Sequence, residues 1–208
     1  MDTSDKEAPE VLASEDVFRG RVFTVSTDTV REAGQEYRRD VVRHPGSAAV
    51  VPVFSDGTVA LVRQYRHPAV KYLLEIAAGT RADFEAPEVC AARELQEELG
   101  LLAGRWESLA EFFVSPGFLT EKMWLYLATD LTETAAAPEE DEHIELVRLP
   151  LKRALDMIAA GEIEDAKTII GLTLAAARLG LRDEEEDRSQ KTGARSQEPG
   201  AGRPNRRQ

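Results

Sequence analysis

The 208-residue sequence predicts an α/β protein, in which a small antiparallel β unit precedes a larger domain of strands and helices. Three observations support this class. Strand-like alternation marks the N-terminal region, a hairpin signal follows it, and a well-bounded helix with two later helical segments completes the pattern. With 42% hydrophobic and 31% charged residues, the composition suits one globular domain with a small appendage.

The N-terminal β unit is expected to span residues 16–45. Asp16–Arg31 and Tyr37–His44 alternate apolar and polar residues, and the EAGQE segment between them carries a glycine turn signal. Residues 1–15 are acidic and lack the basic start and apolar stretch of a signal peptide, so we expect a disordered leader. No apolar run approaches the ~20 residues of a membrane helix, which argues against a membrane partner and makes the cytoplasm the default location.

The main domain is expected at residues 46–181. Two strands, Ser47–Phe54 and Thr58–Arg66, are joined by a hairpin signal at Ser55-Asp56-Gly57. Residues 182–208 have almost no apolar side chains and are rich in Gly, Pro, Ser and charge, so a disordered tail is expected. The remaining strands are expected at 72–76, 106–114, 122–128 and 144–149, and two closing helices at 151–160 and 166–179.

A further helix is expected from Pro87 to Leu99. Proline suits the first position of a helix, and Gly100 suits the left-handed residue just beyond its end. The one cysteine of the chain, Cys90, falls inside this helix, so no intrachain disulfide is possible. We expect a buried packing role for Cys90 rather than a reactive thiol.

The net charge of −12 limits the partners that the protein can bind. Nucleic acid binding requires that phosphates be neutralised, so an acidic protein is a poor generic binder of nucleic acid. If the substrate is itself anionic, positive charge must be supplied locally. Divalent metal ions and a few placed arginines are the candidates.

Three glutamates of the expected helix are candidates for metal binding. Glu97 lies three residues and Glu98 four residues after Glu94. On a helix, this spacing makes all three side chains project toward one side. Such a cluster is tolerable if divalent cations lie among the carboxylates, and Mg²⁺ favours oxygen ligands. A solvated acidic face is the alternative, and for these three residues alone it is the better explanation.

The wider pattern favours the metal site. It consists of Gly79, five residues, Glu85, seven residues, Arg93-Glu94-Leu95, one residue, Glu97-Glu98, one residue, and Gly100-Leu101. This pattern resembles the Nudix box, with every defining position filled. The resemblance implies a Nudix α/β/α sandwich with a mixed sheet. It also implies hydrolysis of a nucleoside diphosphate linked to another group.

The resemblance also implies roles for individual positions. Glu94 and Glu98 correspond to the main metal ligands, Glu97 to a shared or bridging ligand, and the carbonyl of Ala78 to a backbone ligand. The expected ion is Mg²⁺, with Mn²⁺ as the alternative. Arg93 would hold the glutamates in place together with Glu85. The alternative for Arg93 is an ordinary surface ion pair.

Flanking segments resemble one branch of the family, the ADP-ribose pyrophosphatases. VRQYRHP at 62–68 and LLEIAAG at 73–79 are similar to the QYR and EIPAG-like segments of that branch, with Ala77 in place of the usual proline. The SPGF segment puts Pro116 sixteen residues beyond Gly100, a spacing that also resembles this branch. In it, an N-terminal β unit builds a swapped dimer and helps to form the adenine site. The resemblance therefore implies a homodimer.

Four residues are expected to bind substrate. Arg66 is a candidate phosphate clamp, because a guanidinium binds phosphate oxygens in bidentate fashion. On spacing alone, Arg66 is explained equally well as a surface arginine at the end of a strand. The resemblance adds Glu75, Pro116 and Gly117, which lie in its two flanking segments.

The general base is expected on an acidic loop. Relatives place a glutamate on the loop after the SPGF strand, and here that loop is PEEDEHIE. We predict Glu142, with Glu140 second. The alternative is a solvated loop with no catalytic member. Glu121 is a further acidic residue expected to approach the site. The three histidines have no metal-ligand spacing.

The resemblance predicts a Mg²⁺-dependent enzyme that hydrolyses ADP-ribose to AMP and ribose 5-phosphate. Two alternatives remain. Other nucleoside diphosphate sugars are possible substrates, because the flanking loops rather than the box set this choice. A non-catalytic module that senses ADP-ribose is the alternative from another class, although a pure binder would not need the intact glutamates. Hydrolysis of 8-oxo-dGTP fits the Pro116 spacing less well.

Overall fold

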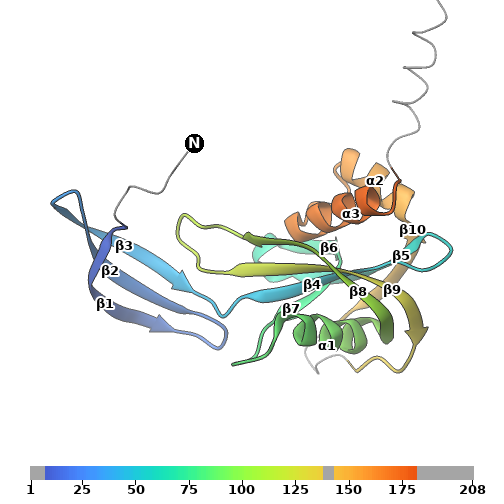
Figure 1. Ribbon diagram of the computed structural model, residues 1–208, viewed down its shortest axis with the longest axis horizontal. Helices are drawn as coiled ribbons and strands as arrows, with labels where there is room; N and C mark the ends of the chain where they lie inside the picture. The colour runs from blue at the N-terminus through green and yellow to red at the C-terminus, as the bar shows by residue number, and fades with distance from the viewer. Residues whose placement is uncertain (1–7, 138–142, 182–208) are drawn as a thin grey trace, which may run out of the picture.

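The computed structural model describes residues 8–137 and 143–181, which form a protruding three-stranded sheet and a layered body (Figure 1). The protruding sheet contains β1 (Glu10–Arg19), β2 (Thr24–Glu32) and β3 (Gln35–Arg43), all antiparallel and in sequence order. The expected N-terminal β unit is therefore present. Its start is earlier than predicted, since β1 already includes residues 10–15 of the expected leader. Residues 1–7 of that leader lie outside the described residues.

The long strand-like segment at 16–31 is divided by a turn. Gly20 donates its N–H to the carbonyl of Phe23 at 2.9 Å, and Arg19 then pairs with Thr24 across β1 and β2. Alternation alone does not show such a turn, because both of its flanks keep the strand pattern. The turn predicted in the EAGQE segment is present between β2 and β3. Ala33 and Gly34 both adopt left-handed φ values, 49° and 79°, which suit a two-residue hairpin turn.

The body contains two sheets. The larger has the order β7-β4-β9-β8 and comprises β4 (Ser47–Pro52), β7 (Ala77–Thr80), β8 (Leu101–Phe113) and β9 (Lys122–Glu133). In it β4 runs parallel to β9, and the other pairs are antiparallel, which confirms the mixed sheet. The smaller is antiparallel, has the order β10-β5-β6, and comprises β5 (Thr58–Arg66), β6 (Lys71–Glu75) and β10 (Glu145–Pro150), with the short helix η1 (His67–Ala69) between β5 and β6.

The predicted hairpin at 55–57 is only partly correct. A tight turn forms there, with Phe54 N–H 2.9 Å from the carbonyl of Thr58. The strands on either side pair only at Val53 and Val59 before they enter different sheets. The reason is that β4 is hydrogen-bonded on both edges, to β7 and β9, and has no edge left for β5.

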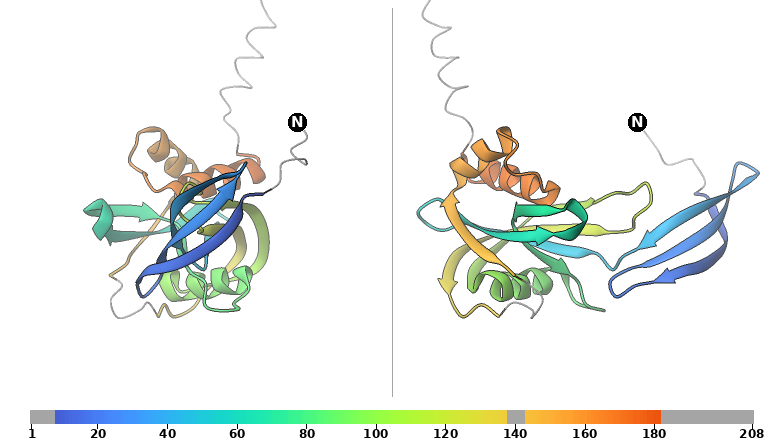
Figure 2. Two further views of the ribbon diagram at one scale, coloured as in Figure 1. Left: turned by 90° about the vertical axis from the view of Figure 1, so that its left-hand side faces the viewer. Right: turned by 180° about the vertical axis from the view of Figure 1, so that it is seen from behind.

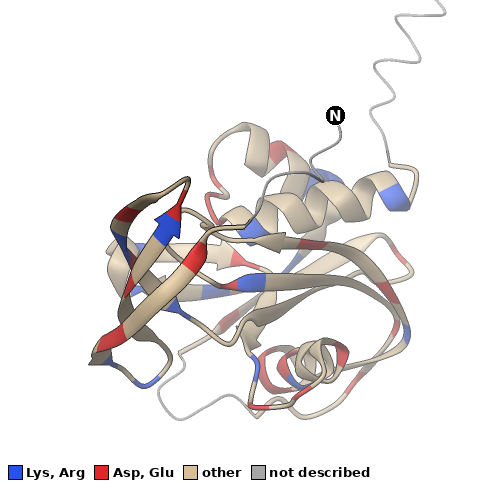
Figure 3. Ribbon diagram, turned by 60° about the vertical axis from the view of Figure 1, so that its left-hand side comes forward, with Lys and Arg blue, Asp and Glu red and all other residues tan. Residues whose placement is uncertain are grey.

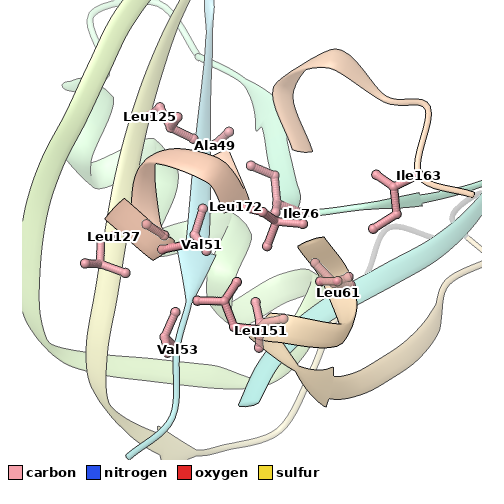
Figure 4. Packing of buried hydrophobic residues seen from close by; sticks show 14 of the residues in the cluster. Ala49, Val51, Val53, Leu61, Ile76, Leu125, Leu127, Leu151, Ile163 and Leu172 are labelled. Carbon is pink, nitrogen blue, oxygen red and sulfur yellow. The ribbon is translucent and has the colours of Figure 1, made fainter. Parts of the chain in front are cut away.

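Helices cover both faces of the larger sheet, which confirms the α/β/α class (Figures 1 and 2). The helix α1 (Pro87–Leu99) packs on one face, and α2 (Leu151–Ala159) and α3 (Ala166–Arg178) lie on the other. Alternate residues of β4 point to opposite faces of the sheet. Ala49 and Val51 join the core under α2 and α3, shown in Figure 4, and Ala48 and Val50 join the core under α1. No helix in the described residues combines the length and apolar content needed to cross a membrane.

The loop before α1 holds an unfavourable backbone conformation. Phe84 has a φ of 62°, and its side chain is fully exposed at 104% of the reference value. A left-handed conformation costs a non-glycine residue about 1–2 kcal/mol, while glycine adopts it freely. Because Phe84 buries no surface that the substitution would lose, we expect Phe84→Gly to raise the free energy of unfolding by about 0.5–1 kcal/mol in urea titrations.

Phe84→Ala is the matched control for this prediction. It removes the same aromatic ring and keeps the Cβ that makes the conformation unfavourable, so no gain is expected. An equal gain in both variants would show that the ring, and not the backbone, is responsible.

Candidate active site

The helix α1 begins and ends as the sequence predicted. Pro87 lies in its first turn, and Gly100 adopts a left-handed φ of 61° and donates its N–H to the carbonyl of Gln96. The buried side of the helix includes Cys90 and Leu95, which pack on the sheet. Burial raises the pKa of the Cys90 thiol to about 12, which agrees with a packing role and not with a reactive thiolate.

Two of the predicted metal ligands lie against the backbone of β7. Glu94 and Glu98 are only 7% and 6% exposed, although both are carboxylates. The N–H of Ala78 donates to Oε2 of Glu98 at 3.3 Å. A Cβ added to Gly79 would lie 1.8 Å from Oε1 of Glu94, so any larger residue at this position would displace the carboxylate. The first glycine of the box therefore leaves the space that the carboxylate of Glu94 occupies.

Arg93 joins three carboxylates around the same helix. Its Nε donates to Oε1 of Glu85 at 3.0 Å, and its Nη1 donates to Oε1 of Glu94 at 2.6 Å and Oε2 of Glu97 at 2.8 Å. The hydrogen bond from Arg93 holds the pKa of Glu85 below its ordinary value. The expected contacts of Arg93 with Glu85 and with the glutamates of the helix are thus present, the latter at Glu94 and Glu97. One cation neutralises part of the acidic cluster that Figure 3 shows on α1.

The donors around β7 fit a hard divalent cation. Glu94 and Glu98 supply buried carboxylate oxygens, which are the ligands that such ions prefer. Glu97 is more exposed, with 36% of its side chain accessible, and pairs with Arg93. Within 8–137 and 143–181, no three acidic, histidine or cysteine side chains stand together as a group that could hold a metal ion. The ligand roles of Ala78, Glu94, Glu97 and Glu98 therefore remain predictions.

Arg66 forms an ion pair with the buried Glu75 next to this strand. The Nε and Nη2 atoms of Arg66 each lie 2.8 Å from one oxygen of Glu75. Lys167, from the first turn of α3, contacts the same carboxylate and lies 3.1 Å from Oδ2 of Asp165. Burial alone would raise the pKa of Glu75, but the hydrogen bonds and charges of Arg66 and Lys167 outweigh it and hold the pKa below 4.5.

Glu75 was predicted to bind substrate, and its burial argues against a direct contact. Its side chain is 1% exposed, and it does not line the neighbouring cavity. Its role in substrate binding remains a prediction, and what the structure shows is its hydrogen bonding with Arg66 and Lys167. Lys167 is the site residue that the sequence reasoning missed. It lies 92 residues after Glu75, and no motif or spacing links the two positions.

A cavity of about 230 Å³ lies between these groups. Arg66 and Lys167 supply cationic groups, and Glu121 supplies a carboxylate. Ser47 donates its hydroxyl to Oε1 of Glu121 at 2.7 Å, which fixes the orientation of this carboxylate. Glu121 thus lies in the cavity, as expected. The full lining is His44, Ser47, Arg66, Ala78, Gly79, Thr80, Glu121, Met123 and Lys167.

Two predicted substrate-binding residues, Pro116 and Gly117, do not line this cavity. Both are exposed in the turn between β8 and β9. This turn is tied to the N-terminal sheet, since Val42 N–H lies 2.7 Å from the carbonyl of Phe118. The two candidates for the base, Glu140 and Glu142, lie outside the described residues, as does the tail at 182–208.

Comparison with known proteins agrees with this geometry. The sequence-family model described as NUDIX domain matches residues 43–170 of the chain. The chain therefore belongs to the Nudix family. It is 35% identical to an ADP-ribose pyrophosphatase of Bacillus subtilis (strain 168), over 83% of this chain and 95% of that protein. It is 40% identical to a methanol dehydrogenase activator of Bacillus methanolicus, with the same coverage of both proteins.

A solved structure supports the fold independently. The crystal structure of an ADP compounds hydrolase aligns with a TM-score of 0.73 and 26% identity. The alignment covers 86% of this chain and 97% of that chain. The similarity therefore extends beyond the Nudix domain match.

Proposed function

We propose that this protein is a Nudix pyrophosphohydrolase that splits ADP-ribose with water into AMP and ribose 5-phosphate. The observation that carries the proposal is the arrangement around β7. Buried Glu94 and Glu98 lie against its backbone, and Ala78, Gly79 and Thr80 of the same strand line one part of the cavity that also holds Arg66 and Lys167. Relatives named ADP-ribose pyrophosphatase in Bacillus subtilis and Mycobacterium tuberculosis, each 35% identical, support this choice of substrate.

The family generally uses divalent metal ions, and we propose Mg²⁺ here, with Mn²⁺ as the alternative. Glu94, Glu98 and the carbonyl of Ala78 would hold the ion, with Glu97 as a shared ligand. When bound, it would supply Lewis acidity toward the phosphoryl oxygens. Arg93 keeps the carboxylates in place, because it bonds to Glu94 and Glu97.

Arg66 binds a phosphate of the substrate in this proposal, because it lines the cavity and its guanidinium is oriented by two hydrogen bonds to Glu75. A general base accepts the proton of the attacking water, and Glu142 is the first candidate, followed by Glu140. Pro116 and Gly117 contact the substrate from the turn in this proposal. Comparing kcat for Glu142→Gln and Glu140→Gln tests both candidates, and full activity in both variants would exclude these two residues as the base.

The test of the proposed function is incubation with ADP-ribose and a panel of nucleoside diphosphate sugars in Mg²⁺ and in Mn²⁺. We expect release of AMP, and the highest kcat/KM for ADP-ribose. GDP-mannose belongs in the panel because GDP-mannose pyrophosphatases of Yersinia are also 35% identical to this chain. A higher kcat/KM for GDP-mannose would favour that substrate. Binding of ADP-ribose without turnover would favour the sensor alternative.

We also propose a cytoplasmic homodimer that is formed through the N-terminal sheet. The outer strand β1 is an exposed edge, and Val11, Val17 and Phe18 on it are 58%, 57% and 53% exposed. Exposed apolar groups on a protruding edge strand are typical of an interaction surface. Light scattering should give twice the chain mass of 23.0 kDa. A mass of one chain at all concentrations would contradict the dimer.

A further inference from the structure

Two cations from distant parts of the chain meet at one buried carboxylate. Arg66 lies at the end of β5 and Lys167 in the first turn of α3, and both bind Glu75 at the end of β6. An ion pair at a buried carboxylate has two explanations. It can be structural, or it can hold the cations for a ligand.

The cations keep hydrogen-bonding capacity beyond the ion pair. Arginine has five N–H donors and lysine has three. The bonds to Glu75 use two donors of Arg66, and the contacts with Glu75 and Asp165 engage at most two of Lys167. Three donors of Arg66 and one of Lys167 are therefore not used by the contacts with Glu75 and Asp165. Both side chains line the cavity, so a ligand there can use these donors.

The position of Lys167 is built into the start of α3. Asp165 caps the helix by accepting from the N–H of Thr168 at 3.0 Å, and it also accepts from the hydroxyl of Thr168. The same hydroxyl accepts from the N–H of Ile76, the residue between β6 and β7. Thr168 is fully buried. The helix start is therefore hydrogen-bonded to the residue just before β7, and Lys167 is held in place before any ligand binds.

We propose that Lys167 is the second cation of a phosphate clamp. Together with Arg66, it binds non-bridging oxygens of the substrate pyrophosphate, and Glu75 positions both cations. Ala78 and Gly79 line the same cavity, so the clamped phosphates would lie beside Glu94 and Glu98. The proposal rests on the proposed function for the identity of the substrate. It assigns substrate contact to a helix outside the Nudix box.

The test is Lys167→Met, which removes the charge and keeps most of the length of the side chain. We expect KM for ADP-ribose to rise about tenfold or more, since hydrogen bonds to charged groups contribute factors of this order. The Kd of ADP-ribose, measured by calorimetry in EDTA, should rise by a similar factor. Lys167→Arg should restore part of the loss, because it restores the charge. Lys152→Met, at an exposed position of α2, is the matched control and should change neither constant.

The outcomes separate the clamp from a structural ion pair and from the proposed function. A lower melting temperature of Lys167→Met with unchanged KM and Kd would overturn the clamp. If the wild type binds ADP-ribose without turnover, the proposed function fails and the Kd values still decide on the clamp. If it does neither, inorganic pyrophosphate is the probe. Weaker pyrophosphate binding by Lys167→Met than by wild type upholds the clamp, and equal or undetectable binding in both overturns it.

Discussion

Glu98→Gln should lower kcat for ADP-ribose by on the order of 10²–10³-fold with little loss of stability. The substitution keeps the shape of the side chain and removes the negative charge of a predicted metal ligand. Folding should tolerate it, because Glu98 is one of a cluster of like charges on α1, where loss of one charge lowers repulsion. The measurement is AMP release at saturating ADP-ribose and Mg²⁺, with thermal unfolding of the same samples.

Glu88→Gln is the matched control for this experiment. Glu88 lies on the same helix but is exposed in its first turn, so kcat should stay within about twofold of wild type. Undiminished AMP release by Glu98→Gln would remove the carboxylate from the reaction, and equal losses in both variants would point to a general effect on the helix.

Glu75→Gln should have the largest effect on stability, lowering the free energy of unfolding by about 3 kcal/mol at pH 7. The variant leaves Arg66 and Lys167 next to a neutral amide at a position that is 1% exposed. Urea unfolding measures the loss. Glu164→Gln is the control, because its ion pair with Lys71 is about half exposed and should contribute less than about 1 kcal/mol.

The stability difference at Glu75 should also depend on pH. The folded-state pKa of Glu75 is lowered from the ordinary value of 4.5, so its charge stabilises the fold above that value. As the pH falls below 4.5, the unfolded chain takes up the proton first, and the contribution is lost as the pH passes through the folded-state pKa. The difference between wild type and Glu75→Gln should therefore be largest at neutral pH and shrink in acid. A difference that stays constant down to pH 3 would contradict this explanation.

Local rules explain why the helix of the Nudix box could be predicted so closely. The bounds 87–99 follow from Pro87 and Gly100, whose backbone preferences act within one turn. The strand at 58–66 was also predicted with its observed bounds, because it is an apolar run ended by turn signals. Pairing between strands could not be predicted in this way. The partner of β4 depends on which edges are occupied, and β9 occupies one of them from about 75 residues away.

The sequence by itself determined the bounds of the helix and which of its charged side chains lie together, because the spacing from Gly79 to Leu101 places Arg93, Glu94 and Glu98 on connected turns. Only the tertiary structure decided what surrounds them. It packs Glu94 against Gly79, buries Glu75, and brings Lys167 to the cavity from 92 residues away. The physical reason is that helix periodicity and caps act over a few residues, whereas ion pairs and cavity walls depend on how the layers pack.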